Sequence, residues 1–207
     1  MVAIIDYDAG NIKSVEKAVQ FLGEEACLTR DPEVILSADR TILPGVGAFG
    51  DAMEKLHGFG LYDVIHDFVK TGRPFLGICL GLQLLFEESE ESEGVKGLSL
   101  LPGKIRRIPE GEENEIRRKV PQIGWNDLTL TPGTRLFQGV KDHSYVYFVH
   151  SYYLDAGDKN QVAATTEYGV TIDAAVEAGN IFACQFHPEK SSEVGLQILK
   201  NFLSLSL

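Results

Sequence analysis

A cysteine with a glycine two residues away on each side is the clearest candidate for chemistry in this 207-residue chain. Cys79 lies between Gly77 and Gly81, after the apolar residues 74–76 and before the apolar run 82–86. Strand, sharp turn and helix around a reactive side chain form the nucleophile-elbow pattern, here with cysteine in place of serine. Such a turn strains the backbone of its central residue, and flanking glycines remove side chains that would clash. The thiol would stand at a helix N-terminus, whose unpaired amides favour the thiolate.

The same pentapeptide has a second interpretation. A free cysteine is most often a core residue, so Cys79 could be buried at an apolar junction between a strand and a helix. The choice between the two depends on whether the chain also supplies a general base and a group that orients it.

His187 is the histidine best placed to be that base. It follows the apolar segment 181–185 and precedes Pro188, which ends the predicted strand. His187 should therefore stand at a strand terminus, as Cys79 does, with Glu189 placed to bind the ring nitrogen that faces away from the thiol. The alternative is a histidine and a glutamate in an exposed turn.

The first half of the chain alternates apolar segments with helical patterns. This predicts an α/β fold with a mostly parallel central sheet covered by helices on both faces. In such sheets, sites form at the carboxyl ends of the strands. We expect strands at 2–5, 26–28, 40–43 and 74–79, and helices after Asn11, after Asp31 and over 61–69.

The second half changes character and predicts an antiparallel extension of the sheet. We expect a charged loop over 111–119, an amphipathic helix over 193–203, and a single domain over residues 1–207. His150 falls inside a predicted strand, where a histidine with satisfied hydrogen bonds is the commoner explanation. The strand-like segments are 105–108, 128–130, 145–154, 162–166 and 181–185.

Composition excludes several classes of protein. The net charge of −11 argues against a nucleic-acid partner. The N-terminus does not resemble a secretory signal, and no apolar run is long enough to span a bilayer, so we expect no membrane association. The cysteines are odd in number, widely spaced and outside CxxC patterns, which argues against a disulfide framework and a zinc site and favours a reducing cytoplasm; they are Cys27, Cys79 and Cys184.

Residues 45–50 match the G-x-G-x-x-G fingerprint of dinucleotide-binding folds. That fingerprint also needs an acidic residue at the end of the following strand, which here ends at Cys79 instead. Two other interpretations are a glycine-rich strip whose amides point into the site beside Cys79, and a turn that binds nothing.

Residues 77–86 together with 185–191 resemble the class I (triad) glutamine amidotransferases. Residues 120–126, with Asp6, Tyr7, Gly10 and Asn11, are similar to one branch of that family, the glutaminase subunits of imidazole glycerol phosphate synthases. The resemblance covers nearly the whole chain. Asp8 departs from it, because the family more often has glycine there; if the position needs a positive φ, aspartate tolerates it better than most residues.

The resemblance implies a flavodoxin-like fold and a glutaminase that needs no cofactor or metal. Cys79 would attack the side-chain amide of L-glutamine, His187 would move the proton, and Glu189 would hold the imidazole. The chain would form a heterodimer with a separate cyclase subunit and pass ammonia to it. The cyclase would then form imidazole glycerol phosphate and AICAR in histidine biosynthesis. The strip is expected to adopt its active orientation only with the partner engaged, so free activity would be low.

The resemblance also assigns roles to further residues. The oxyanion would be bound by amides from Gly45, Val46, Gly47 and Leu80. Substrate would be bound by Gln83, Glu91, Ser151 and Tyr152. The cyclase interface would include Asn11, Trp125 and Lys190, although a core position for Trp125 is a second interpretation.

Three other functions remain open from the sequence. One is the glutaminase of another complex, such as anthranilate synthase, against which the Gly-Trp-Asn sequence at 124–126 argues. Another is a nucleotide-binding oxidoreductase built on residues 45–50. The third is a binding module that kept the fold without catalysis.

Overall fold

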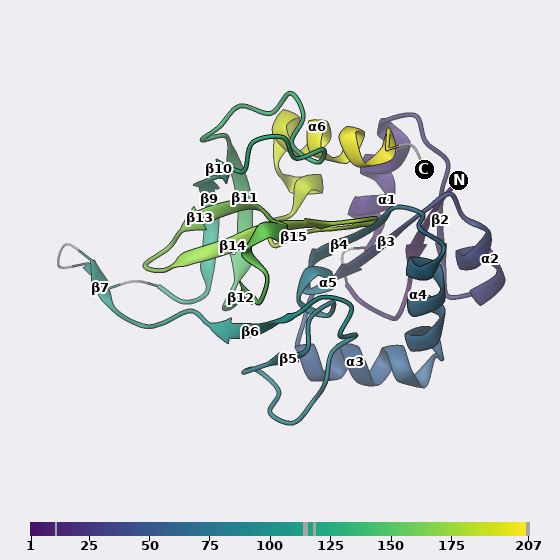
Figure 1. Cartoon of the computed structure of the whole chain (residues 1–207), viewed down its shortest axis with the longest axis horizontal. Coiled ribbons are helices and arrows are strands. Elements are labelled where there is room, and N and C mark those ends of the chain that lie inside the picture. Colours follow the sequence, from purple (N-terminus) through teal and green to yellow (C-terminus); the bar gives the residue numbers. More distant parts are fainter. Residues whose placement is uncertain (11, 114–115, 118, 206–207) are drawn as a thin grey trace.

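The structure, a computed structural model, describes residues 1–10, 12–113, 116–117 and 119–205. Its centre is an eight-stranded sheet in the order β10-β13-β14-β15-β4-β3-β1-β2 (Figure 1). Five neighbouring strands are parallel: β15 (Ile181–Cys184), β4 (Phe75–Cys79), β3 (Arg40–Gly45), β1 (Val2–Ile5) and β2 (Ala26–Thr29). The other three extend the sheet antiparallel: β14 (Thr171–Ala178), β13 (Val162–Glu167) and β10 (Thr129–Leu130).

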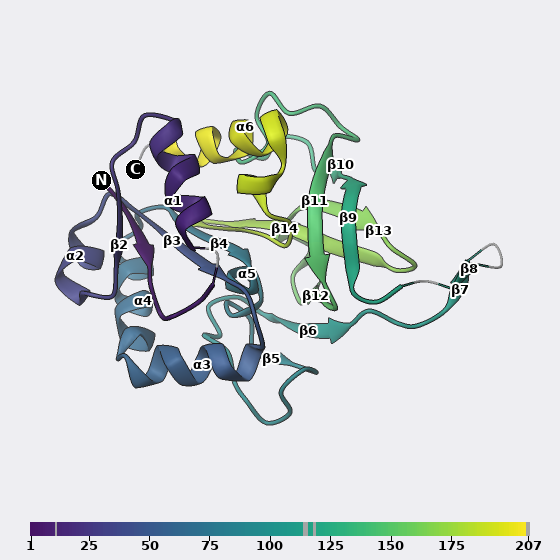
Figure 2. The ribbon, with the colours of Figure 1, turned by 180° about the vertical axis from the view of Figure 1, so that it is seen from behind.

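Helices cover both faces of the sheet, so the predicted fold class is confirmed (Figure 2). Helix α4 (Leu61–Lys70) shows why: its buried residues Leu61, Val64, Ile65 and Phe68 recur at helical spacing and form one apolar stripe. No helix of the described residues is long and apolar enough to cross a membrane. Helices α1 (Ile12–Phe21) and α6 (Ser192–Leu203) lie on one face, and α2 (Pro32–Ser37), α3 (Phe49–Gly58) and α4 (Leu61–Lys70) on the other.

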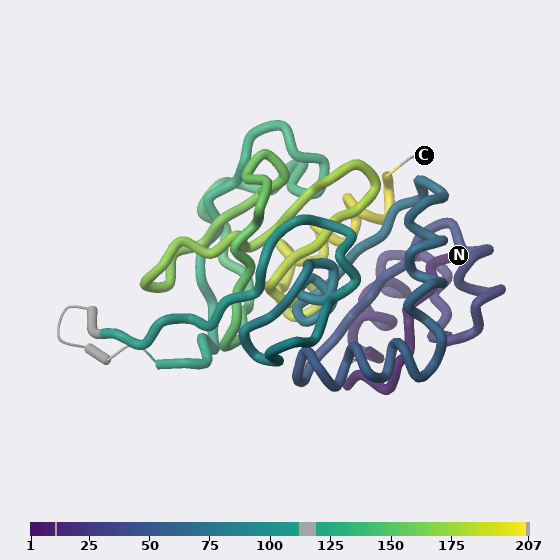
Figure 3. Tube along the Cα trace, turned by 60° about the horizontal axis from the view of Figure 1, so that its bottom comes forward, coloured from purple at the N-terminus to yellow at the C-terminus, as the bar shows by residue number. Residues whose placement is uncertain are grey.

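Much of the second half of the chain, coloured teal and green, forms the end of the molecule away from β1 and β2, whereas the C-terminal part returns toward the N-terminus (Figure 3). The single strand expected over 145–154 is two strands that separate at Ser151: β11 (Tyr145–His150) pairs with β9 (Gln122–Asp127), and β12 (Tyr152–Ala156) pairs with β6 (Gly103–Arg107). Strands β9 and β14 were not predicted. The remaining strands are β5 (Glu88–Ser89), β7 (Glu112–Glu113) and β8 (Ile116–Arg117); β7 and β8 pair within the segment expected to be a loop.

The helix after Cys79 is much shorter than the sequence predicted. Helix α5 (Leu80–Gln83) has a single turn, although residues 84–86 are apolar and compatible with a helix. The carbonyl oxygens of Leu84 and Leu85 accept hydrogen bonds from the amides of Leu98 (2.8 Å) and Leu100 (2.9 Å) instead. The returning segment therefore takes the acceptors that a longer helix would use.

Candidate active site

Cys79 ends β4 and has the strained backbone that the elbow pattern predicted. Its φ of 55° and ψ of −110° lie where only glycine is comfortable. Both flanking glycines are required by close packing: a Cβ on Gly81 would lie 1.8 Å from the carbonyl oxygen of Leu43, and one on Gly77 would lie 2.7 Å from that of Gly81. The side chain is nearly buried, with 6% of Cys79 exposed.

Strand pairing brings the C-terminal motif to the same edge of the sheet. Strand β15 runs parallel to β4, with Cys184 opposite Ile78 in the register. Both strands therefore end side by side, and the chain after Cys184 leaves the sheet next to Cys79. His187 follows at once, directly before the 3-10 turn η2 (Pro188–Lys190).

His187 and Glu189 form a buried pair. Nδ1 of His187 lies 2.8 Å from Oε1 of Glu189, with 2% and 0% of the two side chains exposed. Burial alone would lower the pKa of His187, but its interactions with Cys79 and Glu189 outweigh burial and raise the pKa to about 9. The other ring nitrogen, Nε2, is buried and has no hydrogen-bond partner within the described ranges.

A pocket of about 300 Å³ opens over Cys79. Its size is at the lower end for small-molecule sites. Three of its lining residues were not predicted as site residues: Pro121, Val149 and His150. Gly45, His187 and Glu189 do not line this pocket and instead line a separate, smaller cavity. The predicted residues that line the pocket are Val46, Gly47, Cys79, Leu80, Gln83, Glu91, Ser151 and Tyr152.

Two buried glutamine side chains form a hydrogen-bonded chain that ends at the sulfur. Nε2 of Gln185 donates to Sγ of Cys79 at 3.8 Å, and Nε2 of Gln83 donates to Oε1 of Gln185 at 3.0 Å. Nε2 of Gln83 also donates to the carbonyl oxygen of Tyr152 at 3.0 Å. Sequence reasoning gave Gln185 no role. The sequence feature that could have identified Gln185 is its place as a polar residue directly after the four apolar residues of the buried strand β15.

His150 is a buried histidine with both nitrogens bonded, as its place in a strand suggested. Nδ1 lies 2.8 Å from the carbonyl oxygen of Tyr152, and Nε2 lies 3.1 Å from the side chain of Gln122. Burial lowers the pKa of His150 to about 4, so the ring is neutral at pH 7.

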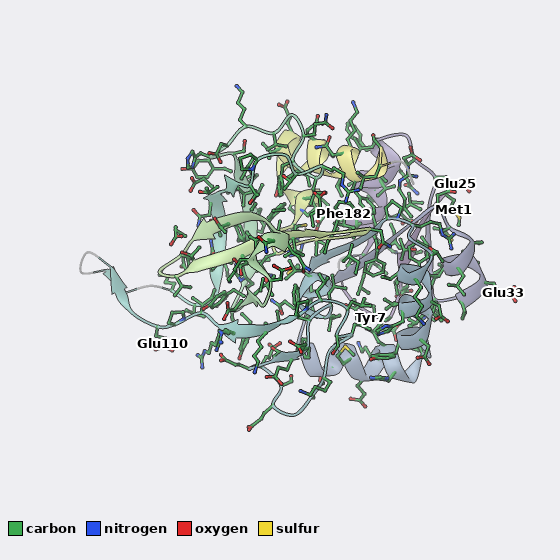
Figure 4. All side chains as sticks on the ribbon, in the orientation of Figure 1. Met1, Tyr7, Glu25, Glu33, Glu110 and Phe182 are labelled. Carbon is green, nitrogen blue, oxygen red and sulfur yellow. The ribbon has the colours of Figure 1, made fainter. Side chains whose placement is uncertain are left out.

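Tyr7, which lies inside the molecule, contacts the start of the glycine-rich strip at residues 45–50 (Figure 4). Its hydroxyl donates to the carbonyl oxygen of Pro44 at 2.9 Å. A Cβ on Gly45 would lie 2.3 Å from the same hydroxyl, so only glycine fits there. Burial raises the pKa of Tyr7, which keeps the phenol protonated as a donor.

Asp8 has the backbone conformation that explains the family's preference for glycine. Its φ is 62°, and Oδ1 accepts a hydrogen bond of 2.6 Å from Nη2 of Arg30. The aspartate is therefore accommodated, with an ion pair that glycine could not make.

The first amides of α3 are already occupied, which argues against a dinucleotide site at residues 45–50. Oε2 of Glu91 accepts from the amide of Phe49 at 2.8 Å, and Oγ of Ser92 accepts from that of Gly50 at 3.0 Å. In a dinucleotide fold these amides would receive a pyrophosphate. The carboxylate of Glu91, bound at the amide of Phe49, would repel the negative charge of a pyrophosphate.

The structure describes two of the three predicted interface residues, Trp125 and Lys190, and both are exposed. Trp125 is 52% exposed on β9, so its possible place in the core is wrong. Lys190 is exposed in η2, and Asn11 lies outside the described residues. Within the described part of the chain, no three His, Cys, Asp or Glu side chains are grouped as a metal site would need.

Comparison with known proteins agrees with this geometry. The family described as "Glutamine amidotransferase class-I" matches residues 3–205. The imidazole glycerol phosphate synthase subunit HisH of Methanothermobacter thermautotrophicus is 49% identical over 205 residues, which cover 99% of this chain and 98% of the relative. The subunit of the same name from Bacillus cereus is 50% identical over 202 residues, covering 98% and 93%.

Solved structures support the fold. One described as a crystal structure of glutamine amidotransferase has a TM-score of 0.75 at 19% identity, covering 98% of this chain and 96% of that one. PurLQS from Thermotoga maritima gives 0.73 at 19% identity, with the same coverage. At this identity the likeness concerns the fold only. Given the near-complete match and the relatives at half identity, this chain belongs to the class-I glutamine amidotransferase family, among the HisH subunits of imidazole glycerol phosphate synthase.

Proposed function

We propose that this chain hydrolyses L-glutamine to glutamate and ammonia as the glutaminase subunit of an imidazole glycerol phosphate synthase. Its family membership supports the reaction, and the name shared by its relatives supports the complex. The structural observation that carries the proposal is the buried His187–Glu189 pair, whose ring interacts with Cys79, together with a pocket of about 300 Å³ that Cys79 lines.

The proposed reaction begins at the sulfur. Sγ of Cys79 attacks the side-chain amide carbon of glutamine, and His187 takes the thiol proton and delivers it to the departing ammonia. Water then hydrolyses the glutamyl thioester, with His187 as the base. Glu189 holds the ring and stabilises its charged form, in keeping with the raised pKa of His187.

The negative oxygen of the intermediate needs donors near Cys79. The amide of Leu80 stands at the first position of α5, where a helix offers it no acceptor. The proposed second donor comes from Gly45, Val46 or Gly47, and Gly47 has a φ of 106° that favours glycine. Losing one such donor costs about 10²–10³ in rate.

The pocket also offers groups that match the backbone end of glutamine. Both N–H groups of Gln83 are directed to protein acceptors, so its Oε1 is the atom left to accept from an ammonium group. Glu91 supplies a carboxylate for the same ammonium. Ser151 and Tyr152 line the pocket, and their backbone amides are the proposed donors to the substrate carboxylate.

An exposed apolar face on the β9–β11 pair is the proposed docking surface for the cyclase subunit. It carries Ile123 (63% exposed), Trp125 (52%) and Tyr145 (59%). The pairing register places Val149 on the same face, and Val149 lines the pocket, so the face reaches the site. Lys190 of η2 and Asn11, which lies outside the described residues, are the other proposed interface residues. The cyclase would receive the ammonia.

The state of the cysteines supports a cytoplasmic location, which we also propose. Cys27, Cys79 and Cys184 are all free thiols. Cysteines without disulfide partners are typical of proteins in a reducing compartment.

The proposal is tested by glutamine hydrolysis with and without a purified cyclase subunit and its ribonucleotide ligand. The cyclase is expected to raise turnover, and Cys79→Ala is expected to abolish it without lowering the melting temperature. Cys27→Ala is the matched control, because this cysteine is half-buried on β2, away from the pocket, and should keep full activity. Turnover that survives in Cys79→Ala would refute the proposed nucleophile, and a cyclase without effect would refute the proposed complex.

A further inference from the structure

A nearly buried sulfur must be stabilised if it is to lose its proton. Cys79 is 6% exposed, and an ionised group removed from water is costly unless donors face it. Helix α5 has one turn, so its N-terminus supplies little of the expected charge. The hydroxyl of Tyr7 is committed to Pro44. The ring of His187, whose interaction with Cys79 helps to raise its pKa, can face the charge, but it also has to move the proton. A donor that stays in place throughout the reaction is therefore of interest.

Gln185 provides such a donor. Its side chain is fully buried, and Nε2 lies 3.8 Å from Sγ of Cys79. On another side, Sγ lies 4.0 Å from the carbonyl oxygen of Val149, which can only accept a hydrogen bond. The carbonyl of Val149 therefore suits the thiol, and the amide of Gln185 suits the thiolate.

The direction of the Gln185 amide is fixed by hydrogen-bond chemistry. The carbonyl oxygen of Tyr152 is an acceptor only, so Gln83 must turn its NH₂ group toward it. The second N–H of that group then meets Gln185, which must present its oxygen, at 3.0 Å. Gln185 consequently presents its own NH₂ group to Sγ. The carbonyl oxygen of Tyr152 thus fixes the orientation of both glutamine amides. As a result, the hydrogen-bonded chain ends in an N–H donor that faces Sγ of Cys79.

We propose that Gln185 is a positioning residue of the reaction: its amide orients the sulfur of Cys79 and favours the thiolate. The inference rests on the proposed role of Cys79 as nucleophile. Among the described residues, the hydrogen bonds of the Gln185 side chain go to Cys79 and Gln83, and moving the proton is left to His187.

The test is the pH dependence of Cys79 alkylation by iodoacetamide, measured on the full chain by mass spectrometry of the Cys79 peptide. Gln185→Met removes the donor with little change of volume. The midpoint pH is expected to rise by about one unit, equal to about a tenfold slower alkylation at pH 7, because a hydrogen bond to a charged group is lost. Gln185→Glu places a carboxylate oxygen against the sulfur and should raise the midpoint further.

Turnover provides the second measurement. In the complex with the cyclase, Gln185→Met should lower kcat at pH 7 about tenfold with little change in KM, and the loss should shrink as pH rises. Gln122→Leu is the matched control: it also removes a buried amide, but one that faces His150, and it should leave the alkylation midpoint unchanged.

The outcomes separate this inference from the proposed function. A midpoint that stays at the wild-type value in both Gln185 variants would overturn the role of Gln185, whatever their turnover. A kcat that falls equally at every pH would also overturn it, because a purely structural defect behaves in that way. If Gln185→Met does not fold, Gln185→Glu decides by the same measurement. Failure of the proposed function would appear separately, as turnover in Cys79→Ala.

Discussion

Gly81 is the position where the elbow leaves least room, so Gly81→Ala tests the geometry most directly. An added Cβ would lie 1.8 Å from the carbonyl oxygen of Leu43, whereas real contacts stay above 3.0 Å. Two backbone segments, α5 and β3, would have to separate by more than an ångström. We expect a loss of about 3 kcal/mol in the free energy of unfolding, the upper part of the range for overpacked sites.

Urea denaturation followed by circular dichroism measures this loss. With a urea m value of about 2 kcal/mol/M, the midpoint should fall by about 1.5 M. Glutamine hydrolysis in the presence of the cyclase should fall as well, because the shift moves Cys79 relative to His187.

Gly58→Ala is the matched control for Gly81→Ala. Gly58 ends α3, and a Cβ there would meet nothing within 4 Å. Alanine should be neutral or stabilise by up to about 1 kcal/mol at such a position. If both variants unfold at the same urea concentration, the close packing of the elbow is wrong.

Two further predictions concern charge and the exposed face. The pKa of His187 is raised from 6.5 to about 9, so its stabilising effect is complete below pH 6.5 and is lost as pH rises through 9. Urea unfolding across this window should show a fall of about 3 kcal/mol, which His187→Gln abolishes; an unchanged slope in the variant would contradict the assignment. Trp125→Ala should weaken binding of the cyclase by about 2 kcal/mol in calorimetry, as a central aromatic residue does. Phe21→Ala, which removes an exposed aromatic ring from α1, should bind like the wild type, and equal affinities in both variants would exclude the β9–β11 face.

The sequence predicted the elbow and the parallel sheet because both follow from local rules. The apolar strand before Cys79, the glycines around it and the proline after His187 each restrict the backbone in one way. Parallel strands end at the same edge of a sheet. This rule was enough to place Cys79 and His187 in the same site, although they are more than a hundred positions apart in the sequence.

The features that were missed depend on distant contacts. Strand β14 contains alanines and acidic residues, which have low strand propensity, and it forms because β13 and β15 flank it. Helix α5 stops early because segment 98–100 takes its acceptors. Gln185 acquires its role from Gln83, which is far away in the sequence. None of these partners can be identified from local pattern alone.

The register between β4 and β15 has a consequence during synthesis. The thiol is synthesised with residue 79, but β15, the strand that leads to His187, begins at Ile181. A nascent polypeptide that has emerged only as far as β14 holds a sulfur with no base beside it. Assembly of the triad therefore requires β15 to pair with β4, which is possible only after residues 181–184 have been synthesised.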